Sequence, residues 1–99
     1  MRRLLPLILL AACGAQPTPL MMGAQRQDVT EAGRNYTLFW TDIRVEVIRL
    51  GWASQGQHQA IRATMIGLIA EITGCRLNER SLTGDSGEMR GRITCPAGA

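Results

Sequence analysis

The pattern of apolar and polar positions changes along the second half of the chain, and it predicts strands before a helix. Residues 36–40 are rich in aromatic and apolar side chains, and residues 43–47 alternate apolar with charged positions. Both segments are typical of β-strands. Thr41 and Asp42 would form an unusual two-residue hairpin loop, so a hairpin and a single long bent strand both remain open. A helix over the second segment is disfavoured by its β-branched residues.

The period becomes helical after residue 54. Ser54 and Gln57 have the spacing of a capping box, and Gly74 is placed to end a helix in the left-handed conformation. We therefore predict a helix over residues 55–73. Five apolar residues fall on one stripe of this helix and should be buried: Ile61, Met65, Leu68, Ile69 and Ile72.

The remainder of the chain predicts two further strands separated by a reversal. Residues 75–78 read as a short strand, and residues 83–87 are dense in turn formers. In residues 89–95, apolar positions alternate with Arg90 and Arg92, which should point away from the core. We expect an α+β domain over residues 36–96, with one amphipathic helix packed on a small antiparallel sheet of three or four strands. The expected order is β-β-α-β-β.

The first twelve residues have the features of a secretory signal. A positive start, Met1-Arg2-Arg3, precedes an apolar run at residues 4–10 that is too short to span a bilayer. The following stretch, Leu10-Ala11-Ala12-Cys13-Gly14, resembles the lipobox of bacterial lipoproteins. The resemblance covers residues 1–14 only. The alternative is an ordinary secreted protein with a chance cysteine near its cleavage site.

The resemblance implies that residues 1–12 are removed, that Cys13 receives a diacylglyceryl thioether, and that the new amino group is acylated. The lipid bilayer would then hold the protein through acylated Cys13, because several acyl chains make anchoring effectively permanent. Lipoproteins retained at the inner membrane commonly carry Asp after the cysteine, and here Gly14 follows it. The implied location is the periplasmic leaflet of the outer membrane. Residues 13–35 show no sustained period and are predicted to be a flexible tether.

The charge of the chain argues against a nucleic-acid partner. The formal net charge is +3, from eleven basic residues, all arginine, and eight acidic ones. Arg2 and Arg3 fall in the signal, which leaves nine arginines against eight acids, or about +1. The remaining arginines are scattered among acids, so no basic block resembles a surface that follows a phosphate backbone.

The cysteine count is consistent with one disulfide. With Cys13 assigned to lipid, Cys75 and Cys95 remain, and an exported domain of this size benefits from a covalent bridge. We predict a Cys75–Cys95 disulfide. A redox pair is disfavoured because twenty residues separate the thiols, and a metal site with His58 would be one ligand short of a closed zinc site. We therefore expect neither a metal nor a cofactor.

One short motif suggests catalysis and is rejected. Gly84-Asp85-Ser86-Gly87 matches the string around the nucleophile of trypsin-like serine proteases. That family needs two β-barrels and a histidine within its own motif, whereas this body is shorter than one barrel and His58 lacks that context. The same letters are those that a tight loop requires. We therefore predict no catalytic residues and no enzymatic activity.

The function expected from the sequence is a membrane-anchored envelope lipoprotein that acts as a non-enzymatic binding or structural module for another envelope protein. The candidate partner surface consists of Tyr36, Trp40 and Trp52, because aromatic side chains often anchor interfaces. In so small a domain these residues could instead form the core. The alternative function is an inhibitor or immunity-type module against an exported enzyme.

Overall fold

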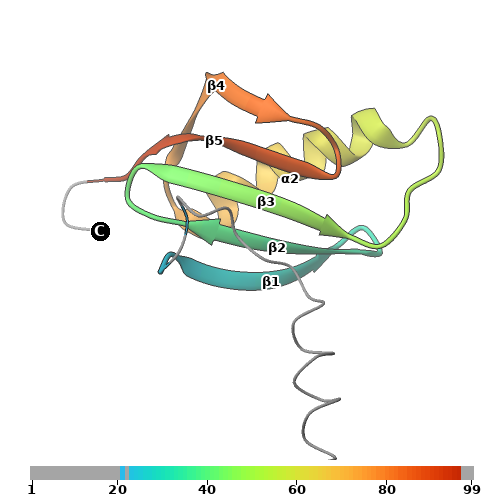
Figure 1. Cartoon of the computed structure of the whole chain (residues 1–99), viewed down its shortest axis with the longest axis horizontal. Helices are drawn as coiled ribbons and strands as arrows, with labels where there is room; N and C mark the ends of the chain where they lie inside the picture. The colour runs from blue at the N-terminus through green and yellow to red at the C-terminus, as the bar shows by residue number, and fades with distance from the viewer. Residues whose placement is uncertain (1–20, 22, 97–99) are drawn as a thin grey trace, which may run out of the picture.

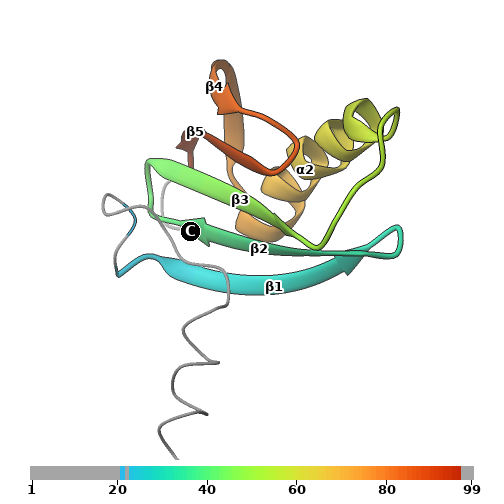
Figure 2. The same cartoon turned by 45° about the vertical axis from the view of Figure 1, so that its right-hand side comes forward.

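The computed structural model describes residues 21 and 23–96 as one helix packed on one face of an antiparallel sheet (Figure 1, Figure 2). The sheet order is β1-β2-β3-β5-β4, with β5 rather than β4 beside β3. The α+β class predicted from the sequence is confirmed. The elements are β1 (Gln25–Glu31), β2 (Arg34–Trp40), β3 (Arg44–Leu50), α2 (His58–Thr73), β4 (Arg76–Gly84) and β5 (Glu88–Thr94).

The first strand was not expected. β1 pairs with β2 along its whole length, from Gln25 opposite Trp40 to Glu31 opposite Arg34. The prediction of a tether over residues 13–35 is therefore wrong from Gln25 onward, and the sheet has five strands in the order β-β-β-α-β-β. Residues 13–20 lie outside the described part of the chain. β1 is mainly exposed, with Val29 half-buried, so its sequence carries little of the alternation that marks a strand.

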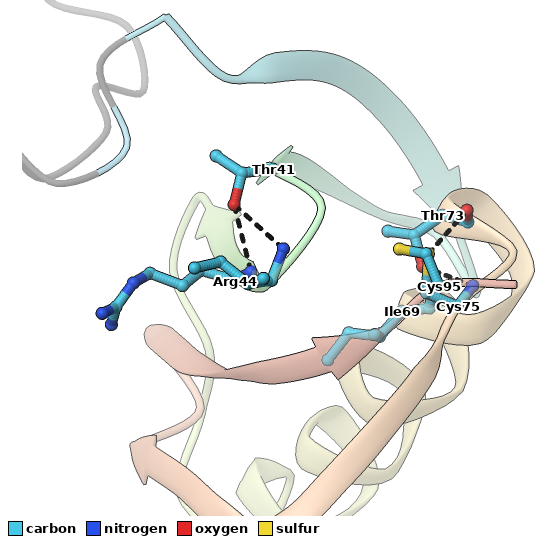
Figure 3. Close-up of a disulfide and its surroundings, with 7 residues drawn as sticks. Thr41, Arg44, Ile69, Thr73, Cys75 and Cys95 are labelled. Carbon is cyan, nitrogen blue, oxygen red and sulfur yellow. Dashed lines mark hydrogen bonds between the residues drawn. A yellow bond between two sulfur atoms is a disulfide. The ribbon is translucent and has the colours of Figure 1, made fainter. Parts of the chain in front are cut away.

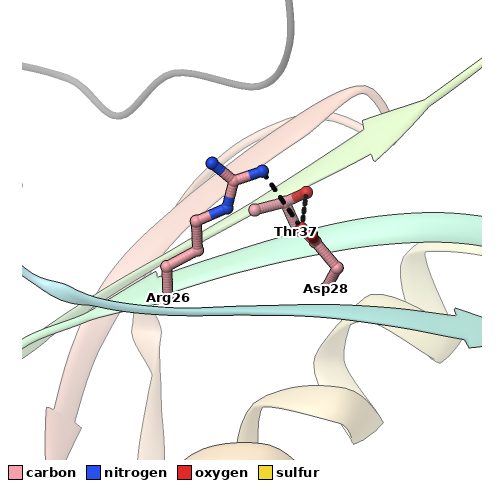
Figure 4. A network of polar contacts seen from close by, with 3 residues as sticks. All are labelled: Arg26, Asp28 and Thr37. Atoms are coloured by element: carbon pink, nitrogen blue, oxygen red, sulfur yellow. Dashed lines mark hydrogen bonds and ion pairs between the residues drawn. The ribbon is translucent and has the colours of Figure 1, made fainter. Parts of the chain in front are cut away.

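Side-chain contacts reinforce the pairing of β1 with β2 (Figure 4). Thr37 donates its hydroxyl to Asp28 Oδ1 at 2.7 Å, and Arg26 Nη2 lies 3.3 Å from the same oxygen. The hydrogen bond from Thr37 lowers the pKa of Asp28, burial opposes it, and the charge of Arg26 acts in the lowering direction. The guanidinium of Arg26 also lies 5.6 Å from the ring centre of Phe39, a cation–π distance. These contacts fix the register on the face away from α2.

Residues 34–50 form a hairpin, which resolves the alternative left open by the sequence. β2 ends at Trp40 and β3 begins at Arg44, so the loop has three residues rather than two. Thr41 holds this turn together: its N–H donates to Arg44 O at 2.9 Å, and its hydroxyl oxygen accepts from the Arg44 N–H at 3.1 Å. In this turn a threonine hydroxyl accepts a hydrogen bond from a backbone N–H three residues later, whereas two-residue hairpin turns commonly rely on an Asn-Gly pair.

The core lies between the inner face of the sheet and one stripe of α2. Four of the five predicted stripe residues are buried, and Ile72 is half-buried against the cluster. They pack against alternate residues of the three central strands, because successive side chains of a strand point to opposite faces. The sheet residues of this cluster are Tyr36, Leu38, Val45, Val47, Met89 and Ile93.

The start of α2 differs from the prediction, whereas its end agrees with it. The helix begins at His58 rather than residue 55, and Gln57 precedes it without a side-chain cap. Gln57 does reach back to accept the Ser54 N–H at 3.2 Å, but Ser54 does not cap the helix. At the other end Gly74 is left-handed, with φ 71°, and its N–H donates to Ala70 O, so the predicted C-terminal glycine is confirmed.

A disulfide joins Cys75, directly after α2, to Cys95, directly after β5 (Figure 3). The predicted bridge is present, with the two Cα atoms 4.3 Å apart. Thr73 supports it, because its hydroxyl donates to Ile69 O and accepts from the Cys75 N–H at 3.0 Å. The disulfide therefore fastens the end of the helix to the last strand.

We expect replacement of Cys75 and Cys95 by alanine to lower the free energy of unfolding by about 3 kcal/mol, since the bridge closes a loop of about twenty residues in the unfolded chain. The measurement is the urea midpoint of the variant beside the oxidised wild type. The reduced wild type is the matched control, because it keeps both side chains. An unchanged midpoint, or two alkylatable thiols in protein purified without reductant, would contradict the assignment.

Candidate functional site

The turn between β4 and β5 brings Ser86 into a cluster of polar side chains. Gly84 opens the turn with φ 96°, and a Cβ there would lie 2.2 Å from Glu88 O, so only glycine fits. Asp85 then accepts the Gly87 N–H at 2.8 Å and the Glu88 N–H at 3.3 Å through Oδ1. These two hydrogen bonds lower the pKa of Asp85. The motif Gly84–Gly87 therefore builds a tight loop, as its composition indicates.

Three elements meet at Ser86. His58, the first residue of α2, places its Nδ1 within hydrogen-bond distance of Ser86 Oγ. Arg49, on β3, donates from Nη1 to Ser86 O at 2.9 Å and lies 3.4 Å from Ser86 Oγ. The Arg49 N–H also donates to Gly87 O at 2.9 Å. The cluster thus ties the start of the helix and the end of β3 to the β4–β5 turn.

The contact between Ser86 and His58 was not predicted, and it does not by itself make a catalytic pair. Ser86 is only 6% exposed, so its Oγ is shielded from an incoming substrate. A serine nucleophile also needs a group that orients its base, and the Asp85 carboxylate is occupied by the turn backbone. Within the described residues, no carboxylate accepts a hydrogen bond from His58. The expectation of no catalytic residues stays a prediction.

The three aromatic residues of the predicted partner surface have different positions. Tyr36 is 1% exposed and belongs to the core, so its placement on a partner surface is wrong. Trp40 is half-buried against the same core. Trp52 is 82% exposed and lies in the segment that joins β3 to α2. Among the three, only Trp52 offers an accessible ring.

A hollow of about 280 Å³ lies beside the segment that carries Trp52. Arg34, at the start of β2, lines it and reaches the segment after β3: Nη1 donates to Trp52 O at 3.3 Å, and Nη2 donates to Gln57 Oε1 at 2.6 Å. The role of Arg34 was not predictable from the sequence, because the hollow depends on the β1–β2 turn, which was not expected. The hollow is lined by Ala32, Arg34, Tyr36, Gly56, Gln57, Ala60, Ile61 and Thr64.

A pair of carboxyl groups occupies the outer face of the sheet. Glu46 on β3 is 2% exposed, and Glu88 on β5 shares a hydrogen bond with it. Burial raises the pKa of Glu88 to about 7, and the hydrogen bond and charge of Glu46 act in the same direction, while Arg90 opposes them. Arg90 Nε lies 3.0 Å from Glu88 Oε2. Below neutral pH the protonated Glu88 can donate to Glu46.

Within residues 21 and 23–96, no three His, Cys, Asp or Glu side chains are grouped as metal ligands. No helix in the same part of the chain has the length and apolar character needed to cross a membrane. Comparisons of the chain with protein-family models, curated proteins and solved structures give no match.

We expect Ser86→Ala and His58→Ala to be coupled in a double-mutant cycle by about 1 kcal/mol of unfolding free energy, the net value of one buried hydrogen bond. The measurement is urea unfolding of both single variants and the double variant. Gln59→Ala, exposed on the next helical position, is the control and should be additive with Ser86→Ala. If the losses of unfolding free energy in Ser86→Ala and His58→Ala were additive as well, the contact between the two residues would not stabilise the turn.

We expect Glu88→Gln to remove a pH-dependent loss of stability. The pKa of Glu88 is about 7 in the folded chain against an ordinary value of 4.5, so the unfolded chain releases this proton first as the pH rises. Wild-type stability should therefore fall between about pH 4.5 and 7 and level off above that window. Below about pH 4.5 the Glu88 carboxyl group is protonated in both the folded and the unfolded chain, so it does not change the free energy of unfolding.

The expected gain from Glu88→Gln above pH 7 is about 1 kcal/mol, kept small because solvent screens a side chain that is 35% exposed. The amide N–H of glutamine can donate to Glu46 in place of the O–H of the protonated Glu88 carboxyl group. The measurement is the urea midpoint against pH for wild type, Glu88→Gln and the exposed control Glu79→Gln. A wild-type midpoint that rises between pH 5 and 7, or the same gain in the control, would contradict this assignment.

Proposed function

We propose that this protein is a membrane-anchored envelope lipoprotein, held by acylated Cys13, whose folded domain is a non-enzymatic binding module for an envelope protein. The stretch Leu10–Gly14 supports the anchor through its resemblance to a lipobox. The periplasmic leaflet of the outer membrane is the proposed location, since Gly14 rather than Asp follows the cysteine. Neither a cofactor nor a nucleic acid is part of this proposal.

The observation that carries the binding role is the exposure of Trp52. A tryptophan ring that is 82% exposed leaves a large apolar surface in water, and tryptophan is enriched among residues that dominate interface energies. The backbone beneath the ring is held by Arg34 through Trp52 O and Gln57, so the ring is carried on a braced segment. We define the Trp52 surface as Trp52 together with the adjacent hollow.

The Trp52 surface lies at the end of the sheet far from where the chain enters it. β1 begins at Gln25, opposite Trp40 and beside the start of β3, whereas Trp52 follows the end of β3 (Figure 1). β1, β2 and β3 are each seven residues long, which separates the two ends by about 20 Å. A domain anchored through its N-terminal side would thus present Trp52 away from its anchor.

A second candidate function, an inhibitor or immunity-type module against an exported enzyme, would use the same surface. Its compact, disulfide-linked frame suits that role. The two functions differ in the partner: a structural envelope protein in the first, a hydrolase in the second. The identity of the protein that crosslinks near Trp52 separates them.

The test is purification from membranes of the host with intact mass and crosslinking on wild type, Cys13→Ser and Trp52→Ala. Wild type should begin at Cys13 and carry the added mass of several acyl chains, which Cys13→Ser should lack and so become soluble. Trp52→Ala should keep the lipid and lose at least about 2 kcal/mol of partner affinity, as expected for a central aromatic contact.

Ile43→Ala is the matched control, because Ile43 is 56% exposed at the opposite end of the sheet and should not affect the partner. An unmodified Cys13 would refute the anchor. A Trp52→Ala variant that captures the partner as well as wild type would refute the proposed surface. The two outcomes are independent of each other.

A further inference from the structure

Two arginines face each other on the outer side of the sheet. Arg44, the first residue of β3, is the direct partner of Arg92 on β5. Their neighbours Val45 and Ile93 are buried in the core, so both arginines project from the opposite face. Figure 3 shows Arg44 at the β2–β3 turn, with its side chain extended away from the disulfide. Arg76, two positions further along the same end, is also exposed on this face.

Neither arginine of this pair takes part in a salt bridge among the described residues. The salt bridges of the described residues join Arg26 to Asp28 and Arg90 to Glu88, and Asp42 in the adjacent turn is exposed. The nearby ion pair on this face uses Arg90 with Glu88. Like charges directly opposite on neighbouring strands are destabilising. An external anion that binds between the two arginines would offset this repulsion.

The surface around the pair is hollowed and partly apolar. A depression of about 440 Å³ lies here, lined by Ile43, Arg44, Asn78, Arg92, Ile93 and Thr94. Ile43 is 56% exposed at its rim. Arginine presents a planar set of donors that matches phosphate oxygens, and an exposed aliphatic side chain beside it can enter the boundary of a bilayer. We call Arg44, Arg92, Arg76 and Ile43 the arginine end of the sheet.

The chain enters the domain at this same end. Gln25 lies opposite Trp40, in the row of the sheet next to Arg44 and Arg92. It is the twelfth residue after Cys13, so the connecting chain spans at most about 42 Å when fully extended, at about 3.5 Å per residue. Because β1 begins at Gln25, this connection is shorter than the tether predicted over residues 13–35, and the domain would lie close to any bilayer that holds Cys13.

We propose that the arginine end docks on the phosphate groups of anionic lipids at the surface of the bilayer that anchors the chain. The inference rests on the proposed membrane anchor and adds a second, electrostatic contact that orients the domain. Juxtamembrane arginines gain attraction from an anionic surface, and that attraction is weakened by salt. With the arginine end on the bilayer, the Trp52 surface faces away from it.

The test measures binding of the unacylated chain, residues 13–99 with Cys13→Ser, to vesicles that contain phosphatidylglycerol and to vesicles of phosphatidylcholine alone. Removing the acyl anchor makes the result independent of whether Cys13 is lipidated in the host, which intact mass decides separately. Wild type should bind the anionic vesicles more tightly, with an affinity that falls as salt rises. Arg44→Gln combined with Arg92→Gln should lower the affinity at least about tenfold.

Two matched variants and one competitor complete the design. Arg62→Gln combined with Arg80→Gln removes the same amount of charge outside the arginine end and should keep most of the vesicle binding. Arg44→Lys combined with Arg92→Lys keeps the charge at the arginine end and should also keep most of the binding. Equal binding to both kinds of vesicle, or equal losses in the two glutamine pairs, would overturn the proposal. Release by inorganic phosphate but not by chloride at matched ionic strength would assign the site to free phosphate and also overturn it.

Discussion

The packing of one stripe of α2 against one face of the sheet is the interaction on which the other features depend. Met65, Leu68 and Ile69 are each at most 1% exposed, and burial of each such side chain contributes about 1.5–3 kcal/mol. The helix is fastened at both ends as well. The Cys75–Cys95 disulfide holds its C-terminal end, and the His58–Ser86 contact holds its first residue. With the helix on one face, the other carries charged side chains beside the buried residues Thr37 and Phe39.

This arrangement gives the sheet two chemically different ends. Antiparallel strands of equal length place the start of β1, the β2–β3 turn and the end of β5 together, and that end carries Arg44 and Arg92. The β1–β2 turn and the segment after β3 lie at the other end, with Trp52 and Arg34. A chain attached at its N-terminal side is thereby suited to contact a bilayer at one end and a protein at the other, which unites the two proposals.

The features that local sequence determines were predictable. The stripe of α2, Gly74 and the alternation of β5 follow from spacing along the chain, and the disulfide follows from two cysteines left after Cys13. β1 was missed because its polar residues show no alternation, so its strand form comes from pairing with β2. The Ser86–His58 contact was missed because it joins residues 28 positions apart. Tyr36 was misplaced because a small domain uses its aromatic residues for the core.

The orientation of the acylated domain on the bilayer can be measured by photocrosslinking from its two ends. A photoreactive amino acid can replace Ile43 in one variant and Trp52 in another, each expressed in the host and illuminated in intact envelopes. We expect lipid adducts from position 43 and protein adducts from position 52. Protein adducts from position 43 with lipid adducts from position 52 would contradict this expectation, because the domain would then face the bilayer with the wrong end.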